Sequence, residues 1–227
     1  MEKLYKNIIV IFATVLFLTP ILFTNLFERL SLKLAGGEKY FIASVNGLDA
    51  GTIRQIKPRG IFDKVYIKIV MDYELIPFNE GYPNLFQTDD INEGIRLEFS
   101  KNGIGLVYGT GDPAAPSTIP MIKRLKFYEI HHIEIDAVDR EYIEVNDSYA
   151  GGYVTTSSAP NFSISNIMIG RGFDDTRKFS GKIYNASISI CDIKIYRRIL
   201  WSLYVVAVIL YVALILITRK IPNKDNK

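Results

Sequence analysis

The chain has 227 residues, of which 27 are basic and 24 acidic, and its formal net charge at pH 7 is +3. Residues 1–7 and 219–227 hold six of the basic and two of the acidic residues, which leaves 21 basic and 22 acidic residues between them. The middle of the chain is therefore nearly neutral. It holds no Lys/Arg cluster with interleaved aromatic residues, so we expect no nucleic-acid partner. Cys191 is the only cysteine, which excludes an internal disulfide and predicts a small buried side chain.

Two blocks, residues 8–27 and 199–218, are almost wholly apolar and contain no Asp, Glu, Lys, Arg or His. A helix needs about 20 such residues to cross the hydrocarbon core of a bilayer. Helices buried in a soluble core rarely stay apolar on every face over this length. Trp201 and Tyr204 lie near the start of the second block, where amphipathic rings favour the headgroup layer. The sequence therefore predicts two transmembrane helices, with the lipid bilayer as a partner.

The first block has an alternative interpretation as a cleaved signal peptide. Its apolar run is longer than the ~7–15 residues of a signal peptide, and no small-x-small cleavage site follows directly, so a retained anchor is the better interpretation. Two spans put both termini on one side. Six basic residues in the tails face six on the opposite flanks, so their number does not decide the orientation. A long loop, however, crosses the membrane largely regardless of its charge. We expect cytoplasmic tails at 1–7 and 219–227 and an extracytoplasmic middle.

Between the blocks, runs with an apolar residue at every second position are separated by Gly, Pro and Asn, which is typical of strands. Residues 40–45 predict a short strand that ends at the turn dipeptide Asn46-Gly47. Residues 62–75 predict a long strand with Lys68 and Asp72 on its polar face. Residues 95–99 and 104–108 flank Lys101-Asn102-Gly103, a strong hairpin signal. The Pro-rich and Gly-rich residues 109–120 predict a loop.

Residues 128–146 predict two strands that meet in a turn at 138–140. His131 and His132 are adjacent and point to opposite faces, so they cannot bind one metal together. Residues 164–190 predict a closing hairpin, in which two strands are joined by the polar run 171–180. The second of these strands is expected over 182–196, where a change of phase indicates a bulge near Cys191-Asp192.

No stretch between the blocks has a clear helical period, and about ten strands separated by turns predict an all-β sandwich or barrel. The predicted order is a spacer at 28–39, an antiparallel β-sandwich at 40–196 and the membrane helix at 199–218. A domain of this size buries enough surface to fold without disulfides.

The order of several segments resembles the laminin-G-like branch of the concanavalin A-like lectin/glucanase superfamily. The segments are GIRLE at 94–98, His131-His132-Ile133, the strand at 142–146, and a closing segment with Ile169-Gly170, Phe179, Gly181 and Ile183. The chain departs from the pattern at Ile130, where a tryptophan is common. The resemblance implies a jelly-roll β-sandwich of two antiparallel sheets over nearly all of residues 40–196. It also implies binding of glycans or proteins, in some members through calcium.

Candidate binding residues lie in the loops, where paired acids, tyrosines and an arginine come together. Tyrosine rings stack on sugars and arginine offers a hydrogen-bonding fork, whereas hard carboxylate oxygens suit calcium. The alternative for each is an ordinary solvated loop residue. The ligand-binding candidates are Asn146, Tyr149, Tyr153, Arg171, Asp174 and Asp175. The candidates for a calcium ion are Asp112 and Asp147.

A catalytic alternative rests on Glu134, Asp136 and Asp139, which resemble the carboxylate strand of laminarinase-type glucanases. Retaining glycosidases place their two carboxyl groups about 5–5.5 Å apart. Asp139 is shorter than the glutamate of that motif and falls in a predicted turn. The sequence therefore favours a membrane-anchored, non-catalytic recognition domain that binds carbohydrate or a partner protein. A structural module of a membrane complex with no glycan ligand is the alternative, and the short spacers agree with it.

Overall fold

The computed structural model describes residues 7, 11, 14, 24–49, 55–60, 62–79, 81–89, 93–110, 112, 116–122, 125–148, 152–155, 160–172 and 177–220. The chain divides into two compact units, one formed by residues 36–193 and the other by residues 1–35 and 194–227. Strands β1 to β11 lie in the first unit, and helices α2 (Thr24–Leu34) and most of α3 (Ile193–Lys220) lie in the second.

Helix α3 contains the predicted second membrane block. Its stretch Ile193–Ile217 has the length and apolar composition of a membrane span, and it is the one such helix among the residues that the structure describes. Its apolar side chains are exposed: Trp201 is 70% exposed and Ile209 is 60% exposed. The predicted first span at 8–27 lies almost wholly outside the described residues. Helix α2 occupies the first part of the predicted spacer at 28–39.

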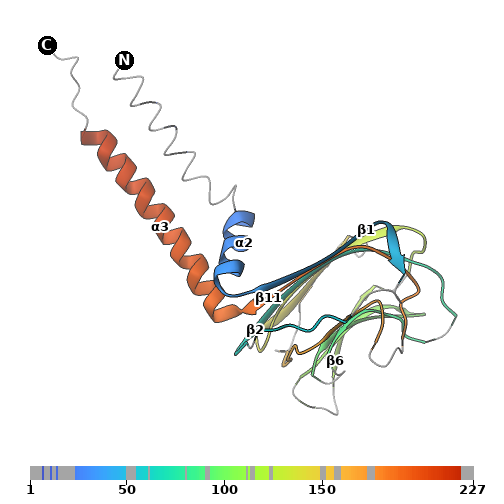
Figure 1. The fold of residues 1–227 in the computed structure, drawn as a ribbon. Coiled ribbons are helices and arrows are strands. Elements are labelled where there is room, and N and C mark those ends of the chain that lie inside the picture. The colour runs from blue at the N-terminus through green and yellow to red at the C-terminus, as the bar shows by residue number, and fades with distance from the viewer. Residues whose placement is uncertain are drawn as a thin grey trace. The chain divides into compact units, whose positions relative to one another are not determined.

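The strands form two antiparallel sheets that stack as two layers (Figure 1). The six-stranded sheet contains, in spatial order, β1 (Glu38–Asp49), β11 (Gly181–Asp192), β2 (Val65–Leu75), β7 (Ile130–Val138), β8 (Tyr142–Asp147) and β9 (Gly152–Thr155). The five-stranded sheet contains β10 (Ile167–Ile169), β3 (Asn84–Thr88), β4 (Ile95–Ser100), β5 (Gly103–Tyr108) and β6 (Ser117–Ile122). The predicted mostly-β fold with antiparallel sheets is confirmed.

The core lies between the sheets and follows from period-two alternation. In β2 every second residue from Val65 to Leu75 is buried, while the residues between them are half-buried on the outer face. Opposite this strand, β4 buries Leu97 and Phe99 on its inner face. Full burial of an aliphatic or aromatic side chain contributes about 1.5–3 kcal/mol, so these rows hold the two sheets together.

The predicted closing hairpin at 164–190 is wrong. Strand β10 pairs with β3 in the five-stranded sheet, whereas β11 pairs with β1 and β2 in the six-stranded sheet. The run between β10 and β11 therefore crosses from one sheet to the other. Local alternation shows that a segment is a strand but not which strand it pairs with. The pairing of β10 and β11 could therefore not be predicted from the pattern.

The predicted bulge at Cys191-Asp192 is also wrong, because the strand ends there and α3 begins at Ile193. Ile193 and Tyr196 are both buried with exposed residues between them, a spacing of three that fits a helix better than a strand. The expected burial of Cys191 is confirmed. Burial, together with the charge of Asp192, raises the pKa of the thiol to about 12, so the thiol stays protonated.

Two predicted breaks lie inside strands. The Asn46-Gly47 turn is an irregular part of β1, and the predicted loop at 109–120 contains the first residues of β6. Pro120 fits there because β6 is an edge strand, whose outer side needs no backbone donor. The hairpin around Lys101 and Asn102 is confirmed. Strands β4 and β5 are paired from Ile95 with Tyr108 at one end to Ser100 with Gly103 beside the turn.

Replacing Ile69 with Ala should lower the free energy of unfolding by about 2–5 kcal/mol, because the side chain is fully buried at the centre of β2. The matched control is Ile130→Ala, since Ile130 is 63% exposed and its loss should change stability by less than about 0.5 kcal/mol. Denaturant unfolding of the full chain in detergent measures both. Equal losses for the two variants would contradict the assigned core.

Candidate functional site

Two neighbouring strands of the six-stranded sheet lose their regular pairing at the same level. The pairing of β11 with β2 shifts between Ile183 and Asn185, which leaves Tyr184 as an extra residue. The pairing of β1 with β11 shifts between Ala43 and Leu48. Gly47 has φ 72°, and a Cβ at this position would lie 2.8 Å from the Cβ of Lys182. Bulges bend a strand and turn its side chains in new directions, and here they open the outer face of the sheet.

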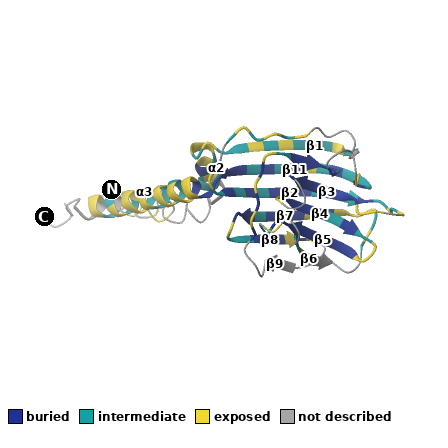
Figure 2. Ribbon diagram, turned by 90° about the horizontal axis from the view of Figure 1, so that it is seen from below, coloured by how far each residue is buried: buried dark blue, intermediate teal, exposed yellow. Residues whose placement is uncertain are grey.

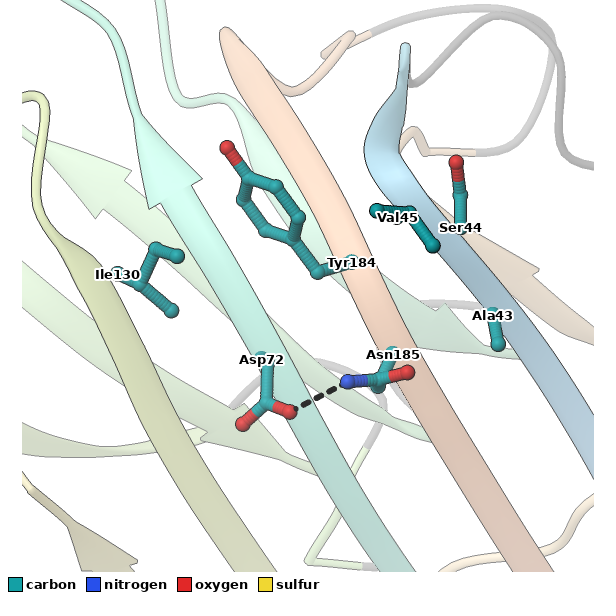
Figure 3. A pocket seen from close by; sticks show the side chains of 7 residues that line it. All are labelled: Ala43, Ser44, Val45, Asp72, Ile130, Tyr184 and Asn185. Atoms are coloured by element: carbon teal, nitrogen blue, oxygen red, sulfur yellow. Dashed lines mark hydrogen bonds between the residues drawn. The ribbon is translucent and has the colours of Figure 1, made fainter.

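An open groove of about 410 Å³ lies over these bulges (Figure 3). Four strands line it: Ala43, Ser44 and Val45 come from β1, Tyr184 and Asn185 from β11, Asp72 from β2 and Ile130 from β7. Val45 is 97% exposed and Ile130 is 63% exposed, so apolar side chains stand at the surface. In Figure 3 the Tyr184 ring lies between Val45 and Ile130. We take this groove as the candidate site.

Asp72 is the polar centre of the groove. Its Oδ2 accepts a hydrogen bond from the Asn185 side-chain amide at 2.8 Å, and its Oδ1 lies 2.6 Å from Nδ1 of His132, which donates to it. Burial raises the pKa of Asp72, but the hydrogen bonds from His132 and Asn185 and the charge of His132 outweigh this effect. The pKa of Asp72 therefore lies below its usual value, and the group is a carboxylate at neutral pH.

Tyr184 is held by a second carboxylate. Its hydroxyl donates to Oε2 of Glu74 at 2.5 Å, and this hydrogen bond, together with some desolvation, raises the pKa of the phenol. The groove thus combines an aromatic ring and aliphatic side chains with an amide and a carboxylate. Such a lining can pack against the apolar face of a ligand and hydrogen-bond to hydroxyl groups at its edge.

The structure places the predicted ligand residues on two different sheets. Asn146 in β8 is exposed and pairs in register with Tyr153 in β9, on the side of the sheet away from β1. Arg171 follows β10 in the five-stranded sheet. Tyr149, Asp174 and Asp175 lie outside the described residues. Asn146 and Tyr153 therefore lie opposite each other on neighbouring strands, whereas Arg171 belongs to the other sheet. The role of all three in binding stays a prediction.

The two predicted calcium ligands have different surroundings. Asp112 is exposed, whereas Asp147 is fully buried, with its Oδ2 3.4 Å from the hydroxyl of Tyr73. Within the described ranges no group of three or more His, Cys, Asp or Glu residues has a geometry that could hold a metal ion. Calcium binding by this chain stays a prediction.

The three carboxylates of the glucanase alternative form ion pairs and hydrogen bonds with other residues of the sandwich. Lys68 belongs to the neighbouring strand β2, and its Nζ lies 2.5 Å from Oε1 of Glu134 and 3.7 Å from Oδ2 of Asp136. Asp139 is buried in the turn after β7, where it accepts hydrogen bonds from the backbone N–H of Phe162 at 3.1 Å and from Nε of Arg140 at 2.8 Å. Asp139 therefore stands apart from the exposed face that carries the other two.

Sequence reasoning missed the groove itself. Alternation had placed Asp72 on the polar face of its strand, and the structure confirms this face. Alternation did not decide which of His131 and His132 is exposed; in the structure His131 is buried and His132 is exposed. The contact of Asp72 with His132 follows from the pairing of β2 with β7, which joins residues 60 positions apart in the chain. Tyr184 could not be assigned a face from the sequence, because the bulge that turns it outward depends on the neighbouring strands.

Comparison with known proteins gives similarities in structure alone. No protein-family model matches the sequence, and no curated protein matches it. The CBM40 module of the Ruminococcus gnavus IT-sialidase, bound to sialyllactose, is 16% identical, with a TM-score of 0.44 over 66% of this chain and 88% of that one. Domains LG4-5 of the mouse laminin alpha1 chain are 14% identical, with a TM-score of 0.43 over 67% of this chain and 40% of that one.

A third similar structure is domain 4 of AbnA, a GH43 extracellular arabinanase from Geobacillus stearothermophilus, in complex with arabinotriose. It is 12% identical, with a TM-score of 0.43 over 71% of this chain and 81% of that one. At these scores the similarities decide neither the fold nor the function. The assignment as a mostly-β protein with two antiparallel sheets rests on the strands of the chain itself.

Replacing Asp72 with Asn should lower stability at pH 6 by less than about 1 kcal/mol, because the carboxylate is partly exposed. The folded pKa of Asp72 lies below the unfolded value of about 3.9, so its contribution is present above that pH and is lost as the pH falls through the folded pKa. Thermal unfolding at pH 6 and at acid pH measures this. The two proteins should converge in acid, and a difference that grows there would contradict the assigned contacts.

Proposed function

We propose that this chain is a membrane-anchored recognition protein whose laminin-G-like, jelly-roll sandwich binds a carbohydrate without catalysing a reaction. The observation that carries this proposal is the groove on the outer face of the six-stranded sheet, with its exposed Val45 and Ile130 around Tyr184, Asp72 and Asn185. An open, shallow groove suits a chain of sugar rings, which lies along a surface and needs no deep pocket.

The chemistry of the lining supports a sugar as the ligand. A sugar ring has an apolar face of C–H groups and an edge of hydroxyls that donate and accept hydrogen bonds. Tyr184, Val45 and Ile130 offer surfaces for the first, and Asp72 and Asn185 offer an acceptor and an amide for the second. The contacts of Asp72 with His132 and Asn185 keep the lining in place before a ligand arrives, which reduces the entropy lost on binding.

The surroundings of the acidic residues support binding without catalysis. A retaining glycosidase needs one free carboxylate as nucleophile and a second as acid and base. Glu134 and Asp136 both pair with Lys68, and Asp139 accepts hydrogen bonds in a turn. We therefore assign these residues a structural role.

The exposed apolar surface of α3 supports the membrane anchor. A helix of this length with exposed Trp201 and Ile209 would be costly in water and is stable in lipid. We place both termini in the cytoplasm and the sandwich outside it, on the basis of the apolar block at 8–27 and the basic tails.

A partner protein in the same membrane is the second candidate ligand. Strand β1 is an edge of the six-stranded sheet, and its outer face exposes Phe41 by 67% and Val45 by 97%. An exposed, apolar edge strand is a template for pairing with another chain. Strand β11 ends at Asp192 and α3 begins at Ile193, so no linker residues separate the sandwich from its anchor. Such a short tether suits a neighbouring partner better than a distant one.

The test is binding of the detergent-solubilised full chain to a glycan array, with wild type compared to Asn185→Ala. We expect wild type to bind one glycan class and Asn185→Ala to bind it about tenfold more weakly, the effect of losing one hydrogen bond of about 1.4 kcal/mol to a sugar hydroxyl. The matched control is Asn102→Ala, in the turn between β4 and β5, which should bind as wild type does.

Three other results would contradict the proposal that the groove binds a carbohydrate without catalysis. Loss of binding in Asn146→Ala but not in Asn185→Ala would move the site to β8. No glycan bound, together with a co-purifying membrane protein that Val45→Asp releases, would establish the second candidate. Hydrolysis of β-glucans that Glu134→Gln abolishes would make the protein an enzyme.

A further inference from the structure

The five-stranded sheet buries polar side chains on the face that points away from the core. In β4, Leu97 and Phe99 face the core, so Arg96 and Glu98 point outward. Arg96 is nevertheless only 6% exposed, and its neighbours in register, Gln87 in β3 and Val107 in β5, are buried as well. Figure 2 shows β3, β4 and β5 coloured largely as buried. A guanidinium group thus lies shielded from water on this face.

Among the residues that the structure describes, the charged groups that pair around Arg96 do not balance. Oε2 of Glu98 lies 2.9 Å from Nη2 of Arg96 and 3.0 Å from Nη1 of Arg177, so one carboxylate oxygen serves two guanidinium groups. The three side chains together carry a charge of +1. Excess charge in a shielded place is unfavourable until a group of opposite sign arrives. Burial and the neighbouring Arg177 lower the pKa of Arg96, against the opposite effect of Glu98.

Two buried polar atoms of this network have no hydrogen-bond partner among the residues that the structure describes. They are Nε of Arg96, a donor, and Oδ1 of Asn84, an acceptor. Asn84 is joined to Gln87 by a 2.9 Å hydrogen bond, and Gln87 stands opposite Arg96 in the sheet. Buried polar atoms in native proteins are nearly always paired. Of these two atoms only Nε of Arg96 is a donor, so it is the one that a negatively charged group would complement.

Arg177 gives access to this network from solvent. Its side chain is 37% exposed and its guanidinium lies 5.8 Å from the centre of the Tyr82 ring, itself on an exposed residue. The backbone carbonyl of Arg177 accepts a hydrogen bond from the N–H of Asn84 at 2.9 Å, which ties Arg177 to β3. A guanidinium held beside an aromatic ring presents a fixed fork of donors, which matches an oxyanion.

We propose that Arg96, Arg177 and Glu98 form a second binding site, separate from the groove, that takes an oxyanion group carried by a ligand. The anion contacts the exposed donors of Arg177, and the charge of the buried Arg96 strengthens its hold. The group is the carboxylate of an acidic sugar or a sulfate or phosphate, since all three offer oxygens to a guanidinium fork. An ion-pair network of purely structural purpose would respond to none of them.

The test is titration calorimetry of the full chain in a detergent with neutral headgroups. The probes are glucuronate, its neutral counterpart glucose, and inorganic sulfate and phosphate. We expect at least one of the anions to bind, added NaCl to weaken this binding, and Arg177→Gln to leave any binding of glucose in the groove unchanged. Arg177→Gln should weaken binding about tenfold to a hundredfold, the effect of a lost charge-assisted hydrogen bond, and Arg177→Lys should retain part of it.

Arg140→Gln is the matched control. Arg140 is also partly exposed, has a positive φ of 58° beside 51° for Arg177, and also contacts one carboxylate, that of Asp139. This variant should bind the anion as wild type does. Circular dichroism shows whether each variant keeps its fold.

If glucuronate binds and neither sulfate nor phosphate does, the ligand group is a sugar carboxylate. If sulfate or phosphate binds and glucuronate does not, the ligand group is a sulfate or phosphate ester. The proposal is overturned if no anion binds, or if folded Arg177→Gln binds the anion as tightly as wild type. Asn185→Ala tests the groove and Arg177→Gln tests the anion site, so the proposed function and the anion site can fail independently of each other.

Discussion

Strand β2 lies between β11 and β7, and its alternation determines which side chains of three strands face the core. From Val65 to Leu75 every second side chain is buried between the sheets, and a shift of one residue would exchange the buried and exposed faces. This pairing is therefore strongly specified. It brings Asp72 opposite both Asn185 and His132, so the polar centre of the groove follows from the register that the core requires.

The bulge at Tyr184 is the place where the sheet departs from this register. One extra residue in β11 leaves the inner face intact, because Ile183 and Ala186 both remain buried. On the outer face it adds an aromatic side chain to a row of short and polar ones. The same sandwich thus keeps a regular core and gains an irregular surface, on the side where a ligand can approach.

The two outer faces differ in their electrostatics. On the six-stranded sheet, Lys68 pairs with both Glu134 and Asp136 at half-exposed positions, where water screens the charges. On the five-stranded sheet, Arg96 is shielded from water, and Glu98 pairs with the guanidinium groups of both Arg96 and Arg177. The strength of an electrostatic interaction depends on its exposure to solvent, and the second face therefore has the greater capacity to attract a charged ligand.

Local pattern was sufficient for the strand content, the outward face of Asp72 and the burial of Cys191, because each depends on period or composition within a few residues. The hairpin at Lys101 and Asn102 belongs to the same class. The second apolar block predicted a helix of membrane length, which α3 provides. The pairing of β10 and β11 with different sheets, the groove around Tyr184 and the shared Glu98 were decided only by the tertiary structure. Each of them joins residues far apart in the chain, and alternation along one strand does not specify which other strands lie beside it.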